Sequence, residues 1–229
     1  MRILAEYLEP LQAFNRERIC DTIVFFGSAR LEGNGSLRKY YDEARELARL
    51  VTLWSNSLPT EKRRYVVCCG GGGGIMEAAN RGASDAGGRS IGLNIGLPQE
   101  QRPNRYVTPE LTFEFRYFFM RKLWFAHLAR ALVVFPGGFG TLDELMEILT
   151  LMQTNKIKRS IPILLYGSSY WNEIINFEAL VRHGMISPDD LALFQFADDP
   201  VAALELLQTG IAAEFKDAMP AIACSRTCD

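Results

Sequence analysis

The sequence has no long apolar run, no excess of charge of one sign and no recognisable targeting segment. Its apolar stretches are far shorter than the roughly 18 residues of a membrane-spanning helix. Twenty-five basic residues stand against 27 acidic ones, and this balance removes the usual electrostatic reason to expect a nucleic acid partner. The first ten residues carry two glutamates instead of the basic and apolar pattern of a signal sequence. We therefore expect a cytoplasmic protein that binds neither membranes nor nucleic acids.

Cysteine and histidine are also scarce. There are five cysteines, and an odd number fits reduced thiols in the cytosol better than a disulfide framework. Cys68 and Cys69 lie inside an apolar run, which predicts that both pack in the core. Cys224 and Cys228 have no further ligand residues near them in the sequence, whereas structural zinc takes four ligands. The two histidines are far apart in sequence, so we expect no metal site.

The composition is otherwise that of an ordinary globular protein, with 48% apolar and 23% charged residues. A chain of 229 residues suits a single domain, and we expect one that spans residues 1–229. Its core is expected at about residues 20–210. Residues 216–229 show little periodicity, which predicts a loosely attached tail.

The pattern of apolar residues predicts alternating strands and helices. Between the predicted strands, apolar residues recur at helical spacing, as in the repeat that begins at Leu142. Ser187 and Asp199 each precede a proline, which predicts two further helix starts. This alternation indicates a Rossmann-like α/β fold, a doubly wound and mostly parallel sheet flanked by helices. Five short β-branched or aromatic runs, four without polar alternation, predict the strands: residues 22–26, 65–69, 90–93, 131–135 and 161–166.

Three of the predicted strands end in turns that contain glycine: residues 26–30, 69–74 and 135–141. In an open parallel sheet these turns meet at the carboxyl edge, where ligands bind. Glycine lets the backbone approach a ligand closely, and the N–H groups at the start of the next helix attract an anion. Two strongly glycine-rich loops therefore predict a phosphate site, with plain turn chemistry as the alternative.

The motifs that are missing narrow the choice of phosphate ligand. None of the loops fits the G-x-G-x-x-G pattern of dinucleotide-binding folds, and no glycine is followed by lysine as in a Walker A loop. Residues 88–92 match the G-x-S-x-G string of serine hydrolases, but they lie at the start of a predicted strand. A nucleophile elbow needs the turn that leaves a strand for a helix, so we discount this match.

Residues 136–144 read P-G-G-F-G-T-L-D-E and match the signature P-G-G-x-G-T-x-x-E. Arg121-Lys122 precedes it, and residues 70–83 form a second glycine-rich block. Together these residues resemble the Lonely Guy family of cytokinin-activating phosphoribohydrolases, often mislabelled "lysine decarboxylase". The resemblance covers roughly residues 22–166 and also includes Gly27-Ser28-Ala29-Arg30 and the block around Asn94. This sequence has Phe118 where the family has methionine, and Gly73 where the family often has proline. Both differences bear on the shape of the base pocket and therefore on the preferred base.

The resemblance implies a Rossmann-like homodimer or an assembly of dimers. It also implies hydrolysis of the N-glycosidic bond in nucleoside 5′-monophosphates, AMP or cytokinin riboside 5′-monophosphates, to a free base and ribose 5-phosphate, with no cofactor. One alternative is a carrier or sensor without catalysis, similar to the molybdenum-cofactor carrier proteins. A pyridoxal-phosphate decarboxylase is a third hypothesis, but no residue is marked as its Schiff-base lysine and the loops fit a nucleotide phosphate better.

Glu144 and Arg121 are the expected catalytic residues. Breaking a ribosyl–base bond builds positive charge on the sugar, which a carboxylate stabilises while it steers a water molecule. We expect Glu144 in the first turn of a helix, although Thr141-x-x-Glu144 is also a capping box that would only satisfy free N–H groups. Arg121 offers a planar fork for phosphate or ribose, or is an ordinary surface arginine. Asp143 and Glu147 are the rival carboxylates.

The remaining candidates bind substrate or phosphate rather than act on it. Lys122 faces about 100° away from Arg121 on a helix, and it belongs either to the pocket or interface or to the surface. The aromatic residues on the same helix are expected to pack in the core, with base stacking or a dimer interface as the alternative. The binding candidates are Gly27, Ser28, Gly71, Gly72, Gly73, Gly74, Met76, Asn94, Lys122, Pro136, Gly137, Gly138, Phe139, Gly140 and Thr141.

Overall fold

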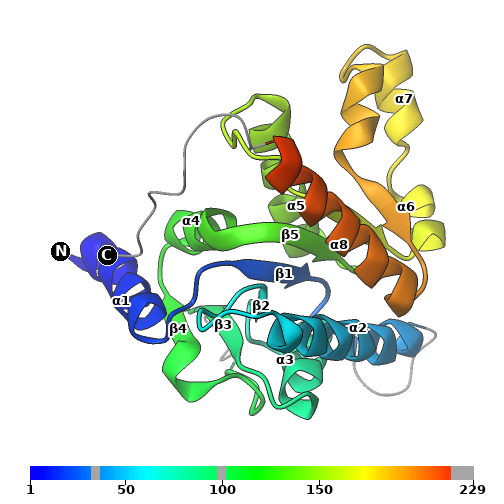
Figure 1. The fold of residues 1–229 in the computed structure, drawn as a ribbon. Helices are drawn as coiled ribbons and strands as arrows, with labels where there is room; N and C mark the ends of the chain where they lie inside the picture. The colour runs from blue at the N-terminus through cyan, green and yellow to red at the C-terminus, as the bar shows by residue number, and fades with distance from the viewer. Residues whose placement is uncertain (32–36, 97–101, 218–229) are drawn as a thin grey trace.

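A computed structural model describes residues 1–31, 37–96 and 102–217 of the chain. In this part of the chain, seven parallel strands form one sheet with helices on both faces (Figure 1). The strands are β1 (Thr22–Phe26), β2 (Val66–Cys69), β3 (Ser90–Ile95), β4 (Thr112–Phe115), β5 (Ala129–Val134), β6 (Ile163–Tyr166) and β7 (Gln195–Ala197). Their order across the sheet is β4-β3-β2-β1-β5-β6-β7, and every neighbouring pair is parallel. The predicted doubly wound Rossmann-like fold is therefore confirmed.

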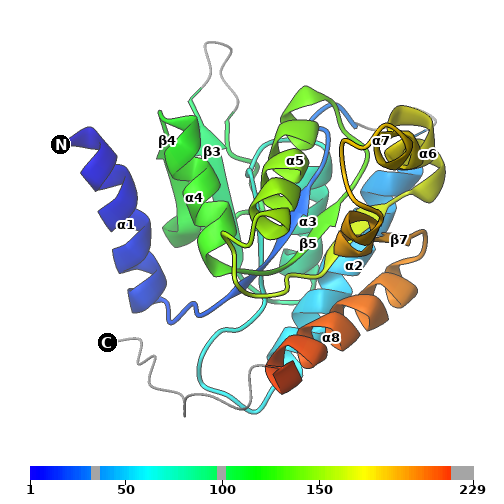
Figure 2. The ribbon, with the colours of Figure 1, turned by 90° about the horizontal axis from the view of Figure 1, so that it is seen from above.

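Helices cover the sheet on both sides, as Figures 1 and 2 show. The α-helices are α1 (Arg2–Arg16), α2 (Arg38–Ser57), α3 (Ile75–Asp85), α4 (Phe118–Leu128), α5 (Phe139–Gln153), α6 (Ser168–Ile174), α7 (Phe177–Arg182) and α8 (Pro200–Asp217). Two 3₁₀ turns, η1 (Pro109–Leu111) and η2 (Pro188–Leu193), complete the described elements. One buried cluster lies between the sheet and α2, α3 and α8, and the other lies between the sheet and α1, α4 and α5.

The five predicted strands are all present, with bounds that differ by a few residues. Two strands, β4 and β7, were not predicted, because both lie at the edges of the sheet and lack an apolar run. Glu114 interrupts β4 on its exposed side, and β7 has three residues of which only Ala197 is buried. The helix start at Asp199 is confirmed, whereas the proline after Ser187 opens a 3₁₀ turn held by a capping box rather than an α-helix.

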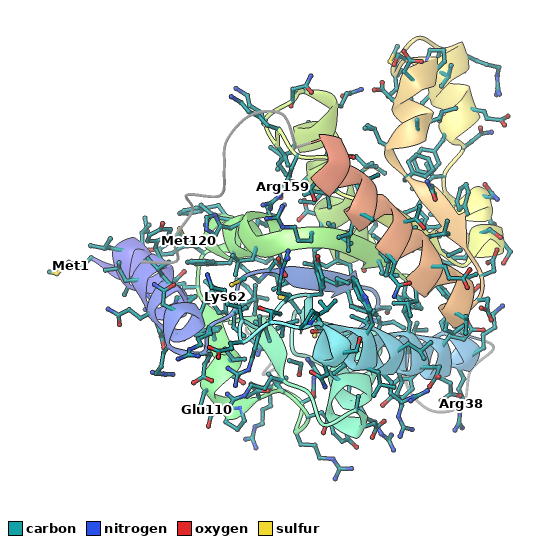
Figure 3. The ribbon with its side chains drawn as sticks, in the orientation of Figure 1. Met1, Arg38, Lys62, Glu110, Met120 and Arg159 are labelled. Carbon is teal, nitrogen blue, oxygen red and sulfur yellow. The ribbon has the colours of Figure 1, made fainter. Side chains whose placement is uncertain are left out.

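The core contains the two cysteines that were expected there. Cys68 lies on one face of β2 and Cys69 on the other, so each joins a different buried cluster. Met120 of α4 also belongs to the core and lies beside α1 (Figure 3). Within the described residues no helix is long and apolar enough to span a membrane. Cys224, Cys228 and the expected tail beyond residue 217 lie outside the described residues.

The order in which the chain adds strands to the sheet reverses between β1 and β5. From β1 the chain builds outward to β4 on one side, then returns to add β5, β6 and β7 on the other. The two neighbouring strands are thus followed by loops that run to opposite faces of the sheet. A crevice opens at such a point in doubly wound folds, at the carboxyl ends of the strands. The loops after β1 and β5 are two of the three glycine-bearing turns of the sequence.

Candidate active site

A cavity of about 790 Å³ lies at this crevice. Its walls come from the loop after β1, the loop after β5, the first turns of α5, and side chains of α3, α4 and α6. Ten of the residues proposed from the sequence line it: Gly27, Ser28, Met76, Arg121, Gly137, Gly138, Phe139, Gly140, Thr141 and Glu144. Segments more than a hundred residues apart in sequence therefore meet in one cavity, at the place where the parallel sheet favours a ligand.

Arg121 and Glu144 form an ion pair at the cavity wall. The Nη2 atom of Arg121 donates to Oε1 of Glu144 over 2.7 Å, and this bond joins α4 to α5. Only 14% of the arginine side chain and 6% of the glutamate side chain are exposed. The rings of Phe118 and Phe125 lie 5.4 and 5.6 Å from the guanidinium carbon, within the range of cation–π attraction. The Nε atom of Arg121 is buried without a hydrogen-bond partner among the described residues.

The electrostatic setting of Glu144 differs from the expectation. Burial raises the pKa of its carboxyl above the ordinary value, while the positive charges of Arg121 and Lys122 oppose that rise. We expected Glu144 in the first turn of its helix, where the N-terminus would favour the ionised carboxylate, and this position is wrong. Helix α5 begins at Phe139, so Glu144 is its sixth residue and lies beyond the first turn. A buried carboxyl with a raised pKa beside a fixed cation is a common feature of functional sites.

The capping alternative for Glu144 is wrong for the same reason. The residue that caps α5 is Gly138, which places Thr141 inside the helix instead of before it. A capping box needs its glutamate three residues after the cap, and Glu144 lies six residues after Gly138. Its carboxylate turns to Arg121 and not to the free N–H groups of the helix. The side chain is therefore part of the cavity and not of the helix end.

The two loops that line the cavity are tied together through their backbones. The N–H of Ser28 donates to the carbonyl of Pro136 over 3.0 Å, and the N–H of Ile75 donates to the carbonyl of Ser28 over 3.0 Å. A Cβ added at Gly27 would lie 2.7 Å from side-chain atoms of Ile75. Only glycine permits this approach of the first loop to α3. The loops are thus held in place before any ligand arrives.

The run of five glycines contributes less to the cavity than expected. Only Gly70 reaches the lining, while Gly71, Gly72, Gly73 and Gly74 lie behind it. The carbonyls of Gly71 and Gly72 accept from Nδ2 of Asn104 over 3.0 and 2.9 Å. The thiol of Cys69, whose pKa burial raises to about 12, accepts from the N–H of Gly71. A Cβ added at Gly71 would lie 3.1 Å from the Cα of Gly92, so this loop packs closely against β3.

Three further candidates lie outside the cavity lining. Asn94 is buried, with its amide nitrogen 2.7 Å from the position of a Cβ added at Gly71, and Pro136 is buried under the second loop. The Nζ atom of Lys122 contacts Asp143 at 2.8 Å and Glu147 at 2.7 Å. It lies beside a second depression of about 670 Å³ on the outer side of α4. The rival carboxylates thus pair with Lys122, and neither lines the cavity.

Several lining residues were not predicted. The aromatic residues of α4 divide: Trp124 and Phe125 are buried as expected, whereas Phe118 and Phe119 are half exposed. Phe118 and Phe125 line the cavity in spite of that difference. The other unpredicted lining residues are Phe25, Phe26, Ala29, Arg30, Gly70, Ile95, Leu142, Tyr170 and Ile174. Tyr170 and Ile174 belong to the short helix α6, which carries no motif, so no local signal indicated them.

Comparison with known proteins gives a consistent result. The family model described as "Possible lysine decarboxylase" matches residues 76–207, more than half of the chain. The chain is 31% identical over 184 residues to cytokinin riboside 5′-monophosphate phosphoribohydrolase LOG3 of Arabidopsis thaliana, an alignment that covers 79% of this chain and 76% of that protein. The rice protein named cytokinin riboside 5′-monophosphate phosphoribohydrolase LOG is also 31% identical, over 75% of this chain and 64% of its own length.

A solved structure similar in fold is the molybdenum cofactor binding protein of Rippkaea orientalis. It has a TM-score of 0.55 and 19% identity, with 82% of this chain and 96% of that chain covered. Identity this low shows a common fold and no more. The sequence relatives and the family model carry the assignment instead. The chain belongs to the Lonely Guy family, whose model bears the description "Possible lysine decarboxylase".

Proposed function

We propose that this protein hydrolyses the N-glycosidic bond of nucleoside 5′-monophosphates, AMP or cytokinin riboside 5′-monophosphates, to a free base and ribose 5-phosphate. The observation that carries the proposal is the Arg121–Glu144 pair at the wall of a cavity that also holds two glycine loops. In the proposal, backbone N–H groups of the loops bind the phosphate, and the carboxylate of Glu144 in the same cavity lining meets the sugar. The names of the sequence relatives support the same reaction.

In the proposed reaction the oxygen of a water molecule bonds to C1′ of the ribose while the C1′–N bond breaks. The electron pair of that bond leaves on the nitrogen of the base, and a proton completes the free base. Positive charge develops on the sugar in the transition state, and the carboxylate of Glu144 stabilises it and orients the water. Arg121 holds the carboxylate in place and adds a cation for the phosphate or ribose oxygens. The proposed reaction uses no metal ion or organic cofactor.

The direct test is incubation with AMP and with isopentenyladenosine 5′-monophosphate, followed by chromatography for the free base. Adenosine, which lacks the phosphate, is the matched control, and we expect it to be a far poorer substrate. Equal amounts of base and ribose 5-phosphate are expected from the nucleotides. Absence of free base from a panel of purine and pyrimidine monophosphates would overturn the proposal. Tight nucleotide binding by calorimetry without any product would instead favour a carrier.

We further propose a homodimer or an assembly of dimers, located in the cytoplasm. Helix α4 exposes Phe118, Phe119 and Leu123 by 50%, 55% and 41%, an apolar face beside the cavity. The buried thiols of Cys68 and Cys69 form no disulfide, which supports a reducing compartment. Light scattering after size-exclusion chromatography tests the assembly, and a monomer of 25.8 kDa would contradict it. Phe119→Glu is expected to weaken the association.

A further inference from the structure

Tyr170 of α6 contacts the backbone of the second glycine loop. Its hydroxyl donates to the carbonyl of Gly137 over 2.8 Å, and its half-buried ring lines the cavity. This bond connects a helix outside the P-G-G-x-G-T-x-x-E signature to the second residue of that signature. Among the described residues, no other side-chain hydroxyl donates to the backbone of residues 136–140.

The bond fixes the direction of a backbone amide. The described residues contain no cis peptide bond, so the carbonyl of Gly137 and the N–H of Gly138 point in opposite directions. When Tyr170 holds the carbonyl, the N–H of Gly138 is therefore held as well. Gly138 caps α5, where free N–H groups and the helix dipole favour an anion. Tyr170 thus sets the orientation of a donor at the start of α5 by holding the opposite edge of the same peptide group.

Tyr170 itself is held by a rigid support. The adjacent Trp171 is fully buried, and its indole N–H donates to the carbonyls of Val134 and Tyr166 over 3.2 and 3.0 Å. The rings of Tyr170 and Trp171 meet edge to face with centroids 5.2 Å apart. Because Val134 ends β5 and Tyr166 ends β6, α6 is anchored to both strands. The phenol therefore reaches the loop from a fixed position.

The loop leaves little freedom at the residue that Tyr170 contacts. A Cβ added at Gly137 would collide with the side chain of Thr141 and would lie 3.0 Å from the backbone nitrogen of Ser28. The preceding carbonyl, that of Pro136, already accepts from Ser28. Two successive carbonyls are thus bound, one by the N–H of Ser28 and the other by the hydroxyl of Tyr170.

We propose that Tyr170 is a positioning residue of the candidate active site, whose hydroxyl orients the Gly137–Gly138 peptide so that the N–H of Gly138 meets the substrate phosphate. This inference rests on the proposed function, and it adds a residue that the signature does not contain. It assigns the hydroxyl to affinity for the phosphate and leaves bond breaking to Glu144. A variant without the hydroxyl should therefore lose nucleotide affinity and keep most of its maximal rate.

The test compares Tyr170→Phe with the wild-type protein and with Tyr41→Phe. Tyr41 is a matched control, because its hydroxyl is also half-buried and also donates one hydrogen bond, to Glu77 over 3.0 Å, but away from the cavity. We expect Tyr170→Phe to raise KM for AMP about tenfold, with kcat within about threefold of wild type. Tyr41→Phe should leave both constants within about twofold. Equal KM values for Tyr170→Phe and the wild-type protein would overturn the inference.

Binding measurements separate this inference from the proposed function. In a Glu144→Gln background, calorimetry with AMP and with adenosine isolates affinity from turnover. Addition of Tyr170→Phe should weaken AMP binding about tenfold and leave adenosine binding unchanged. An equal loss of affinity for both ligands would contradict a role of the hydroxyl in phosphate binding. If the wild-type protein turns over no nucleotide, the proposed function fails, but the amide NMR signal of Gly138 still reports on Tyr170. An unchanged Gly138 signal in Tyr170→Phe would contradict the positioning role.

Discussion

The guanidinium of Arg121 and the carboxylate of Glu144 meet at 2.7 Å between α4 and α5, two helices that share one buried cluster with the sheet. Both side chains are largely buried, and the carboxylate lies at the cavity wall. A carboxylate in this position is costly to bury, and the partner cation compensates for only part of that cost. Such an arrangement is typical of sites where charge develops during a reaction.

Glu144→Gln should separate binding from chemistry. The amide keeps the shape of the side chain but carries no charge to stabilise the sugar, so we expect turnover to fall about 10²-fold or more with nucleotide binding retained. Asp143→Asn is the matched control on the same turn of α5, because Asp143 is exposed and lies outside the cavity lining. Steady-state kinetics with AMP measures both variants. Near-normal turnover by Glu144→Gln would show that the carboxylate takes no part in the reaction.

The free energy of unfolding should depend on pH through the carboxyl group of Glu144. Burial raises its pKa, so the folded state favours the protonated form more than the unfolded chain does. Its contribution to stability is then fully present below the ordinary value of 4.5 and is lost as pH rises through the raised pKa. The free energy of unfolding of the wild-type protein, relative to Glu144→Gln, should therefore decrease as pH rises from 4.5. Urea unfolding of both proteins across that range tests this, and an increase would mean that the Arg121 pair outweighs burial.

The sequence carried strong signals for the strands of the sheet centre, because strands covered on both faces have continuous apolar runs. Edge strands lack that pattern, and β4 and β7 were therefore not predicted. The helix start near Glu144 was wrong because Thr141 and Glu144 have the spacing of a capping box, whereas the glycines before Thr141 allow α5 to begin at Phe139. Local spacing cannot show whether Gly138 or Thr141 caps the helix.

The candidate site was predictable where its residues lie in motifs. The signature residues other than Pro136 meet Arg121 in the cavity, since parallel strands bring their carboxyl ends to one edge. Tyr170 was not predictable, because its contact with Gly137 spans 33 residues and depends on how α6 packs on β5 and β6. The run of five glycines was expected to contact the ligand because of its composition. Its backbone instead contacts Asn104 and lies close to Gly92 of β3.

Two neighbouring glycines should respond differently to alanine. At Gly137 a Cβ would collide with Thr141, so Gly137→Ala should lower the free energy of unfolding by about 1–3 kcal/mol as well as activity. At Gly138 a Cβ would meet nothing within 4 Å, so Gly138→Ala should leave stability unchanged. If a phosphate binds at the start of α5, the added methyl group occupies part of its place and KM for AMP rises. Thermal unfolding and steady-state kinetics of the two alanine variants test these expectations. An unaltered KM in Gly138→Ala would show that the phosphate binds elsewhere.

The N-terminal helix should stabilise the helix that carries Arg121. Glu6 of α1 is buried, and its carboxylate accepts from the N–H groups of Arg116 and Tyr117 at the start of α4, over 3.1 and 3.3 Å. The backbone carbonyl of Glu6 also accepts from the indole of Trp124 over 3.1 Å. A carboxylate at a helix N-terminus satisfies free N–H groups and is favoured by the helix dipole.

Glu6→Ala should therefore lower the free energy of unfolding by about 1–2 kcal/mol, because two partly buried N–H groups lose their acceptor. Glu9→Ala is the matched control, since Glu9 lies on the same helix but is exposed, and its effect should stay within about 0.5 kcal/mol. Urea unfolding measures both variants. The first turn of α4 should also fray, which lowers the occupancy of the Arg121–Glu144 bond and with it kcat/KM for AMP. A Glu6→Ala variant as stable as Glu9→Ala would show that solvent replaces the carboxylate and that α1 is dispensable to the site.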